Sequence, residues 1–480
     1  MNSPYIKMAS YSQLEDIVKN ITTKTINNIC IAGTSSGDGK TIVTLALLRA
    51  LKKRGLKIQP FKCGPDYIDG VFHKHGCDQI SINLDTKMMG VNAVRESFFY
   101  HCKNKDVAVI EGVMGLYDSA KIGSLAGSTA EVAISNSSKV ILVVNARGMA
   151  SSIAAIVKGY CELNSEISII GVIANKVGSD YHAKLLKEAL EFYNLAPLLG
   201  YLNRDDELIL PERHLGLVPF FENNCHEEWF DYLGEKAEEN FDIDKILTLS
   251  QQQINFSNFN HLIPKVKPLN KKLRIAYALD EAFNFYYEDN LRFLRKLGIE
   301  LVPFSPLHDS ILPHNINGLY FGGGFPEMFV EKLAQNNIIK AEIKKFSELK
   351  NCFIYAECGG YMYLTNSIKD NNGHVYKMCG IINSQAIMNN QRKALGYKQV
   401  ELIQARREFE NMAFNGHEFH WSSIKEQLYS DRLWNMTTMR DGSQSITGYC
   451  DFKNKIFASY IHLHFSSNLP FLKKILAKID

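Results

Sequence analysis

The sequence feature that most constrains the fold is a glycine-rich turn at residues 33–41, between an apolar strand and an amphipathic helix. The run Ile29–Ala32 predicts a buried strand, and Ile42–Lys53 has the apolar spacing of a helix. A glycine-rich turn at a helix N-terminus presents backbone N–H groups to an anion, and the helix dipole favours negative charge there. The segment therefore predicts a phosphate-binding loop. The alternative is a Gly/Ser-rich turn whose lysine binds no ligand.

The loop contains the residues that we expect to hold a nucleotide. Lys40 would reach the β- and γ-phosphates of ATP, and the Thr41 hydroxyl would bind Mg²⁺. The spacing differs from the usual G-x-x-x-x-G-K-[ST], because Gly33 lies one residue early and Thr34 takes its place. Asp38 puts a negative charge in the loop, so we expect it to point outward or to be paired. The predicted ATP-binding residues are Gly33, Thr34, Gly37, Gly39, Lys40 and Thr41.

The chain as a whole has the strand–helix alternation of two α/β domains. Its 480 residues are many for one hydrophobic core. Apolar runs bounded by turn residues suit parallel sheets covered on both faces, which predicts two doubly wound α/β domains. The runs are Ile29–Ala32, Lys57–Phe61, Val107–Ile110, Val140–Val144, Ile167–Ala174, Leu273–Ala278, Glu300–Phe304, Gly318–Phe321 and Cys352–Ala356. The expected boundaries are 1–27 for an N-terminal extension, 28–221 for an ATP-binding domain, 222–271 for a helix and linker, and 272–480 for the second domain.

Acidic side chains follow two of the predicted strands in the first half. Asp66 and Asp69 lie just past the second strand, Glu111 ends the strand Val107–Ile110, and Asp118 follows in the same segment. Ligands of parallel sheets bind at the carboxyl ends of the strands. Mg²⁺ usually takes one or two carboxylates together with phosphates. We therefore expect Mg²⁺ near these residues, although each acid alone could equally be an ordinary turn residue.

Cys358 is the predicted nucleophile of a second site. It follows a predicted strand and precedes two glycines and a helix-like run, which is the arrangement of a nucleophile elbow. We expect the helix N-terminus to lower the thiol pKa. The backbone amides of Gly323, in the glycine run 322–324, and of Gly359 are candidate oxyanion donors. Without this context, a lone cysteine would more often be a buried structural thiol.

A cysteine nucleophile needs a base. His462, in a short segment after the apolar run Ile456–Tyr460, is the predicted base. His464 and the pair His417 and His420 compete for that role, because a lone histidine is more often structural than catalytic.

Composition narrows the classes of partner. The net charge of +3 is too small by itself to indicate nucleic acid or a membrane surface. The first residues lack the apolar core of a signal peptide, and the longest apolar region, Val140–Tyr160, is interrupted by Asn145, Arg147 and Lys158. We therefore expect a cytoplasmic protein with its ten cysteines reduced, and no nucleic-acid or membrane partner.

The two halves also resemble known families. The longer phosphate loop and the first half resemble dethiobiotin-synthetase-like domains, and the second half resembles class I glutamine amidotransferase domains. Together they resemble the cobyrinate a,c-diamide synthase family. The strings that carry the resemblance are FKCGPDYIDG, NLD (83–85), EGVMGLYD, PERHLGLV (211–218), DEAFNFYYEDNL (280–291), GGGFPE, AECGGYMYL, LGY (395–397), GHEFHWS (416–422) and SYIHLHF.

This resemblance implies the chemistry. ATP would phosphorylate a peripheral carboxylate of a corrin-type macrocycle, and ammonia released from glutamine at Cys358 would attack the acyl phosphate, first at one and then at the other of the a and c carboxylates. It implies that Thr41, Asp66 and Glu111 serve Mg²⁺–ATP. It also implies that Asp69 and Asp118 serve phosphorylation or the substrate.

The resemblance leaves several points open. The wider amidotransferase class carries an acid two residues after the histidine, but His464 stands there in this sequence. We therefore expect a Cys–His dyad whose base, His462, is oriented by a backbone carbonyl or by another side chain. The aromatic residues of 283–287 could line the macrocycle or a domain interface, or pack in the core. His73, Arg213 and His214 are candidates for contacting substrate carboxylates.

Two rival functions remain. A Ni-sirohydrochlorin a,c-diamide synthase would share nearly all of these strings and the same chemistry. A P-loop switch ATPase of the partitioning type would share the phosphate loop but would have no use for a glutaminase domain. The oligomeric state is open, and a homodimer is one alternative.

Overall fold

The computed structural model describes residues 23–119, 121–205, 212–213, 216–217, 227–256, 267–350, 353–403, 413–425 and 432–477. The chain divides into two compact units between residues 263 and 264, with Lys87–Gly90 grouped with the second unit. Most of the expected N-terminal extension and His214 lie outside the described residues, as does the side chain of Arg213.

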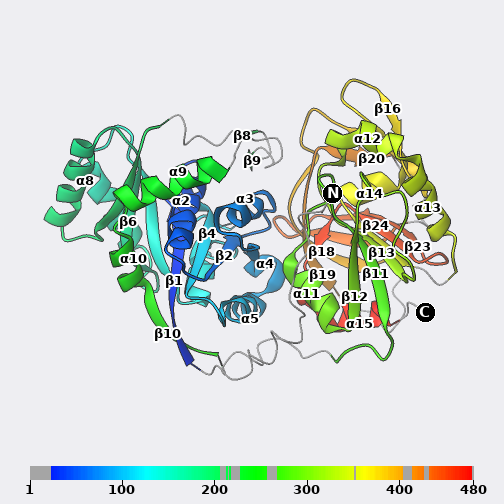
Figure 1. The fold of residues 1–480 in the computed structure, drawn as a ribbon, viewed down its shortest axis with the longest axis horizontal. Coiled ribbons are helices and arrows are strands. Elements are labelled where there is room, and N and C mark those ends of the chain that lie inside the picture. The colour runs from blue at the N-terminus through cyan, green and yellow to red at the C-terminus, as the bar shows by residue number, and fades with distance from the viewer. Residues whose placement is uncertain are drawn as a thin grey trace. The chain divides into compact units, whose positions relative to one another are not determined.

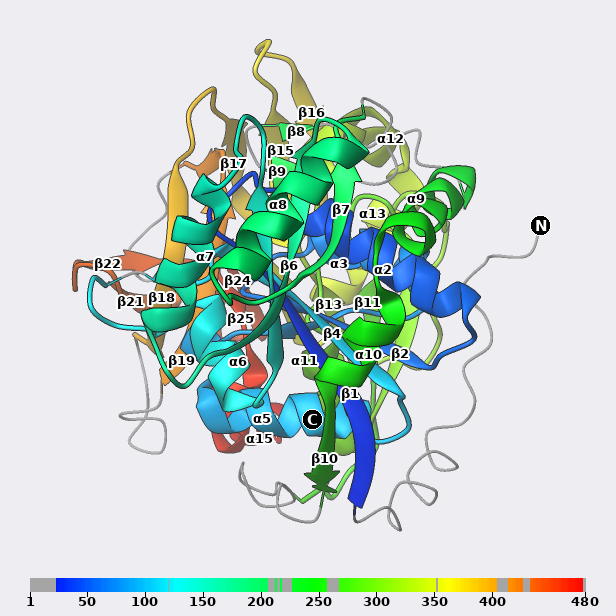
Figure 2. The same cartoon turned by 90° about the vertical axis from the view of Figure 1, so that its left-hand side faces the viewer.

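The first unit is built on an eight-stranded sheet with helices on both faces (Figure 1). Seven strands run parallel in the order β3-β2-β4-β1-β5-β6-β7, and β10 pairs antiparallel with β1. Figure 2 shows α2 and α9 on one side of β1, and α6 and α7 on the other. The strands are β1 (Thr23–Gly33), β2 (Ile58–Cys63), β3 (Ile82–Leu84), β4 (Val107–Gly115), β5 (Lys139–Asn145), β6 (Ser168–Val177), β7 (Leu198–Asn203) and β10 (Gln251–Asn255), with a separate pair β8 (Glu212–Arg213) and β9 (Gly216–Leu217). The helices are α2 (Lys40–Lys53), α3 (Ile68–Cys77), α5 (Val91–Cys102), α6 (Thr129–Ser135), α7 (Ser152–Glu162), α8 (Asp180–Phe192), α9 (Glu227–Asn240) and α10 (Ile243–Ser250). The short helix α4 (Thr86–Met89) follows β3 in the chain, and all but its first residue are grouped with the second unit.

The order of the sheet places β2, β4 and β1 side by side next to the glycine-rich loop. Strands β2, β4 and β1 are neighbours, and Glu111 of β4 lies opposite Lys62 of β2 and Ile31 of β1 in the register. Apolar side chains of α2, such as Leu47, pack with Ile29 of β1 in one buried cluster. This packing fixes the start of α2 beside the carboxyl ends of the strands.

The segment 222–271, expected to be a helix and linker, contains regular elements of the first unit. Helices α9 and α10 contribute Phe230 and Ile246 to its core, and β10 extends its sheet. The polar composition of α9 has a physical explanation, because its acidic side chains form ion pairs with two arginines. Arg49 lies in α2, and Arg54 directly follows the end of that helix. The polar residues of α9 therefore mark a surface helix of the first unit.

The second unit has a six-stranded sheet in the order β12-β11-β13-β14-β24-β23, parallel except for β23. Two further sheets, β16-β15-β17-β20 and β22-β21-β18-β19-β25, complete it. The strands are β11 (Leu273–Ala278), β12 (Ile299–Phe304), β13 (Gly318–Phe321), β14 (Phe353–Glu357), β15 (Thr365–Lys369), β16 (Val375–Lys377), β17 (Ile382–Met388), β18 (Ala394–Leu402), β19 (Ala413–His420), β20 (Ser422–Ile424), β21 (Trp434–Thr438), β22 (Gln444–Thr447), β23 (Tyr449–Asp451), β24 (Ile456–Ser459) and β25 (His462–Leu463). The helices are α11 (Glu288–Lys296), α12 (Val330–Gln335), α13 (Asn337–Ser347), α14 (Gly359–Leu364) and α15 (Leu469–Leu476), with 3₁₀ turns η4 (Pro326–Phe329) and η7 (Phe465–Asn468).

The prediction of two α/β domains is confirmed. Each of the nine apolar runs named above overlaps a strand of the two main sheets. Within the part of the chain that the structure describes, no helix combines the length and apolar character needed to cross a membrane.

Candidate active sites

The glycine-rich loop joins the end of β1 to the start of α2. Gly39 precedes the first residue of α2 and has φ of 93°, a left-handed conformation that favours glycine. A Cβ at Gly39 would lie 2.0 Å from Nδ2 of Asn175, at the end of β6. Asn175 Nδ2 donates to the carbonyl of Asp38 at 2.8 Å. Strand β6, two positions from β1 in the sheet, therefore holds the loop where only glycine fits.

Asp38 is paired inside the loop. Its carboxylate accepts hydrogen bonds from the Thr34 hydroxyl at 2.5 Å and from the Ser35 backbone N–H at 2.6 Å. The Asp38 carboxylate therefore stabilises the conformation of the loop. Lys40 Nζ donates to the Ser35 carbonyl at 3.0 Å, and a Cβ at Gly33 would lie 3.0 Å from the same nitrogen. The lysine head thus lies over the loop, where a phosphate would bind.

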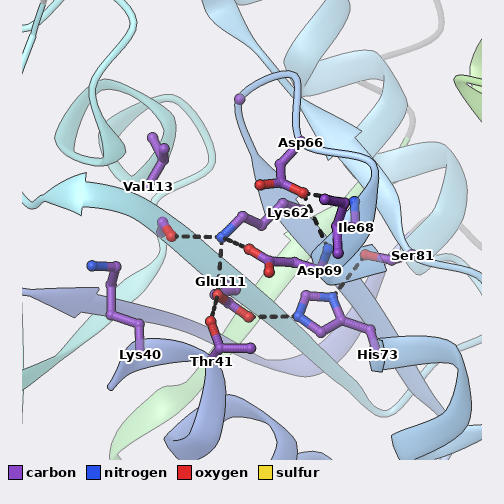
Figure 3. Close-up of polar contacts among 12 residues, drawn as sticks. Lys40, Thr41, Lys62, Asp66, Ile68, Asp69, His73, Ser81, Glu111 and Val113 are labelled. Atoms are coloured by element: carbon purple, nitrogen blue, oxygen red, sulfur yellow. Dashed lines mark hydrogen bonds and ion pairs between the residues drawn. The ribbon is translucent and has the colours of Figure 1, made fainter. Parts of the chain in front are cut away.

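A buried network of charged side chains lies beside the loop, and Lys62 is at its centre (Figure 3). Lys62 Nζ is 2.5 Å from Asp69 Oδ2 and 2.9 Å from Glu111 Oε1, and it donates to the Gly112 carbonyl at 3.1 Å. The Thr41 hydroxyl donates to Glu111 Oε1 at 2.7 Å. The network therefore joins the start of α2 to the end of β2 and to the middle of β4.

The electrostatics of this network are strongly coupled. Burial by itself would lower the pKa of Lys62, but Asp69 and Glu111 raise it above its ordinary value. Burial by itself would raise the pKa of Glu111, but Lys62 and His73 hold it below the usual range. Burial and the charge of Asp66 raise the pKa of Asp69 to about 8. The same network thus shifts the pKa values of its two carboxyl groups in opposite directions, upward for Asp69 and downward for Glu111.

The other predicted polar residues lie around this network. Asp66 Oδ1 accepts the backbone N–H groups of Ile68 and Asp69 at the start of α3, at 2.7 and 3.1 Å. Asp118 lies in the turn after β4, where it accepts the backbone N–H of Gly115 at 2.8 Å.

His73 is not placed to contact a substrate. It is fully buried, with its Nε2 at 2.6 Å from Glu111 Oε2 and its Nδ1 at 2.9 Å from the Ser81 hydroxyl. The expectation that it binds substrate carboxylates is therefore corrected: His73 holds Glu111.

The oxygen atoms in this region fit a hard divalent cation accompanied by phosphates. Among the described residues, no group of three or more His, Cys, Asp or Glu side chains has the geometry to hold a metal ion. Mg²⁺, however, needs only one or two carboxylates when phosphates and water complete its coordination. The Thr41 hydroxyl and the Glu111 carboxylate lie 2.7 Å apart beside the loop, and they provide such a minimal set.

The second site is a tight turn at Cys358. This residue links β14 to α14 with φ of 47° and ψ of −105°, a strained conformation for a residue with a side chain. Its backbone N–H donates to the Ser459 carbonyl at 2.8 Å. The turn is therefore held by the adjacent strand β24, and its strain fits a nucleophile elbow.

The glycine run 322–324 and His462 converge on this turn. Gly360 N–H donates to the Gly322 carbonyl at 3.1 Å, and a Cβ at Gly359 would lie 3.3 Å from the Gly324 nitrogen. A Cβ at Gly323 would lie 2.3 Å from Cε1 of His462, so the imidazole ring lies directly on this glycine. The structure thus brings Cys358, both predicted oxyanion glycines and the predicted base into one region.

The Cys358 thiol does not have the lowered pKa that we expected. Burial raises its pKa well above the ordinary value, the nearby Glu327 raises it further, and the Gly359 N–H has a smaller opposing effect. Helix α14 has six residues, so its dipole is weak compared with the loss of hydration. The thiol is therefore protonated at neutral pH and needs a base to react.

The competing histidines have structural contacts. His464 Nδ1 lies 2.7 Å from the Ser466 hydroxyl, and burial lowers its pKa to about 4. His420 lies 2.8 Å from Glu418 and stacks on Tyr460, with ring centroids 3.7 Å apart. His417 lies opposite His462 in the register of β19 and β25, and burial lowers its pKa to about 3. Of the four, only His462 rests on the glycine run.

The aromatic segment 283–287 supports the glycine run. Phe283 is fully buried against Phe321 and Tyr363, and the Tyr286 hydroxyl accepts the Gly322 N–H at 2.8 Å. Of the three roles considered for this segment, packing in the core therefore describes Phe283 and Tyr286.

Sequence reasoning missed three residues of these sites. They are Lys62, Asn175 and Glu357, whose Oε2 lies 3.6 Å from His462 Nδ1. All three are polar residues at or near the ends of buried strands, and that position was the available signal.

Comparisons with known proteins assign a family to each half of the chain. Residues 29–218 match the family described as the CobQ/CobB/MinD/ParA nucleotide binding domain, and residues 274–470 match the CobB/CobQ-like glutamine amidotransferase domain. Fold and sites thus define the class: an ATP-using, glutamine-dependent amide synthase, which is a ligase.

Curated relatives match along nearly the whole chain. The chain is 42% identical over 450 residues to the cobyrinate a,c-diamide synthase of Leptospira interrogans serovar copenhageni, covering 92% of this chain and 96% of the relative. Relatives of the same name from Priestia megaterium and Listeria monocytogenes (EGD-e) are each 40% identical, over 92% and 95% of this chain and 94% and 100% of theirs. The chain belongs to the cobyrinate a,c-diamide synthase family.

Proposed function

We propose that this enzyme converts the a and c carboxylates of cobyrinate to amides, with ATP and glutamine as co-substrates. The observation that carries the proposal is the identity of about 40% with relatives of that name over at least 92% of the chain. The phosphate loop and the cysteine elbow, each with its own buried network, support the two half-reactions.

The first half-reaction is carboxylate activation at the loop. A carboxylate oxygen of the macrocycle attacks the γ-phosphorus of ATP, forming an acyl phosphate while the bond to ADP breaks. Lys40 and the N–H groups of the loop would hold the phosphates, because the loop lies at the start of α2. Asp69 and Asp118 are the proposed substrate and phosphorylation residues. The raised pKa of Asp69 supports a group that exchanges a proton near neutral pH.

Mg²⁺ is the proposed cofactor of this step. Thr41, Glu111 and Asp66 would hold it together with the phosphates, and the bound ion would neutralise charge on the transferring phosphoryl group. Oε1 of Glu111 accepts hydrogen bonds from both the Thr41 hydroxyl and Lys62 Nζ. The chain's own role is to keep that carboxylate ionised and fixed.

The second half-reaction releases ammonia at Cys358. The thiol transfers its proton to His462, and the sulfur attacks the carboxamide carbon of glutamine while Gly323 and Gly359 N–H groups stabilise the oxyanion. The C–N bond then breaks, ammonia leaves with the proton, and water hydrolyses the thioester to glutamate. Ammonia attacks the acyl phosphate, giving the amide and inorganic phosphate.

The test is product mass analysis. The purified enzyme is incubated with ATP, glutamine and either cobyrinate or Ni-sirohydrochlorin, and the macrocycles are analysed for replacement of one or two carboxylates by amides. We expect the diamide from cobyrinate. Product from the nickel macrocycle alone would overturn the proposal in favour of the nickel enzyme. Glutamine-independent ATP hydrolysis without any amide would favour the partitioning-type switch, although the amidotransferase match over 274–470 argues against it.

A further inference from the structure

Glu357, the residue before the proposed nucleophile, lies in a buried polar pocket of its own. Its side chain is 1% exposed. Oε1 accepts hydrogen bonds from the Tyr355 hydroxyl at 2.8 Å and from the Leu463 N–H at 3.2 Å. Oε2 accepts from the Tyr320 hydroxyl at 3.4 Å and lies 3.6 Å from Nδ1 of His462. Hydrogen-bond donors thus converge on both oxygens of the carboxyl group.

The sheet order fixes this arrangement. Strand β14 runs parallel to β24, with Glu357 opposite Ser459, and His462 follows only three residues after the end of β24. Asn290 of α11 clamps the strand that carries His462, because its amide donates to the Leu463 carbonyl at 2.7 Å and accepts the Phe465 N–H at 2.8 Å. The acid and the imidazole are therefore both held by backbone contacts.

We propose that Glu357 is the positioning residue of His462, so that the glutaminase centre is a Cys–His–Glu arrangement whose acid directly precedes the nucleophile. The inference deepens the proposed function and rests on His462 as the base. With Nδ1 turned toward Glu357, Nε2 is the nitrogen left to take the proton of Cys358. The acid acts through the imidazole and does not touch glutamine.

The residue two positions after His462 cannot supply this charge. His464 is buried, its Nδ1 faces the Ser466 hydroxyl, and its lowered pKa keeps it neutral. On the paired strand, His417 also faces His462 and is neutral for the same reason. Burial raises the pKa values of Tyr320 and Tyr355, so both remain donors. Among these neighbours, only Glu357 offers a negative charge to the imidazole.

The chemical consequence concerns the imidazolium. When the Cys358 S–H bond breaks, the proton forms an N–H bond at His462 Nε2, and the ring becomes positive. A carboxylate facing Nδ1 stabilises that charge and selects the tautomer with Nδ1 protonated. The separation of 3.6 Å is longer than a hydrogen bond, and such catalytic contacts commonly tighten only when substrate is bound.

The test compares Glu357→Gln with the control Glu348→Gln, which removes an exposed carboxylate at the end of α13. The readout is glutamate release from glutamine across a pH series, with ammonium-dependent amidation measured in parallel to report folding. We expect kcat for glutamate release by Glu357→Gln to fall on the order of 10²-fold, within the range of general acid–base catalysis. The limb of the kcat/KM profile set by His462 should move to lower pH, because the imidazolium has lost its counter-charge.

Glu357→Asp keeps the charge, one methylene farther from Nδ1. We expect it to restore part of kcat and to return the limb toward its wild-type position. An unshifted limb in Glu357→Gln, Glu357→Gln with wild-type kcat, or a limb in Glu357→Asp displaced as far as in Glu357→Gln overturns the proposal. If Glu357→Gln loses ammonium-dependent activity as well, the variant is not properly folded, and Glu357→Asp provides the test. A limb of its kcat/KM profile near the wild-type position supports the proposal. Glutamate release does not depend on which macrocycle is amidated, so failure here is distinguishable from a wrong acceptor substrate.

Discussion

At the scale of single residues, the first site depends on buried charges that stabilise one another. Lys62 is 4% exposed and contacts two carboxylates, one on α3 and one on β4. A buried charge is costly unless it is paired, and removal of one partner leaves the other uncompensated. Lys62 therefore has a structural role as well as a place beside the phosphate loop.

Replacing Lys62 with methionine should be strongly destabilising. Asp69 and Glu111 would face each other without a cation, so we expect the free energy of unfolding, measured by urea denaturation, to fall by about 3–5 kcal/mol. Lys53→Met is the matched control, because Lys53 pairs with Glu235 and Asp231 on the surface and should change stability by less than about 1 kcal/mol. Equal stability of the two variants would contradict a coupled buried network.

The reactivity of Cys358 should respond to the charge of Glu327. Burial has the larger effect in raising the thiol pKa, and the charge of Glu327 adds to it. The thiolate fraction is therefore small at neutral pH and increases as the pH rises. We expect Glu327→Gln to shift the pH profile of iodoacetamide labelling at Cys358 to lower pH. Peptide mass spectrometry separates this site from Cys161, whose labelling provides the internal control. A Cys358 profile that is identical in both proteins would show that Glu327 has no such effect.

At the scale of elements, the strands and the loop were predictable because their signals are local. The apolar run Ile29–Ala32, the glycines and the start of α2 are contiguous, so their meaning does not depend on distant residues. The roles of Lys62, Asn175 and Glu357 were not predictable, because each depends on which strands are neighbours. The direction of the Cys358 pKa was also missed, since burial is a tertiary property.

The loop offers a matched pair of glycine substitutions. Gly39 and Gly55 both have positive φ, of 93° and 75°, but only at Gly39 would a Cβ collide with Asn175. Gly39→Ala should therefore abolish nucleotide binding, measured by calorimetry, because the loop must move. Gly55→Ala should leave binding unchanged and cost only about 1–2 kcal/mol of stability for the left-handed conformation. Nucleotide binding by Gly39→Ala with wild-type affinity would show that Asn175 does not fix the loop.

At the scale of the whole molecule, one chain carries two separable chemistries. Each unit has its own parallel sheet and its own buried core. On our proposal, the first unit activates a carboxylate and the second releases ammonia from glutamine. Supplying ammonia from outside should therefore bypass the second centre and leave the requirement for the first.

The most direct measurement is amide formation on cobyrinate, by mass, with ATP and either [¹⁵N-amide]glutamine or ¹⁵N-ammonium as the nitrogen source. Cys358→Ser should lose the product from glutamine by at least about 10²-fold, the contribution expected of a catalytic group, and keep the product from ammonium. Lys40→Ala should lose both products. Glutamine-dependent amidation at the wild-type rate by Cys358→Ser, or by Lys40→Ala, would contradict the assignment of the two centres.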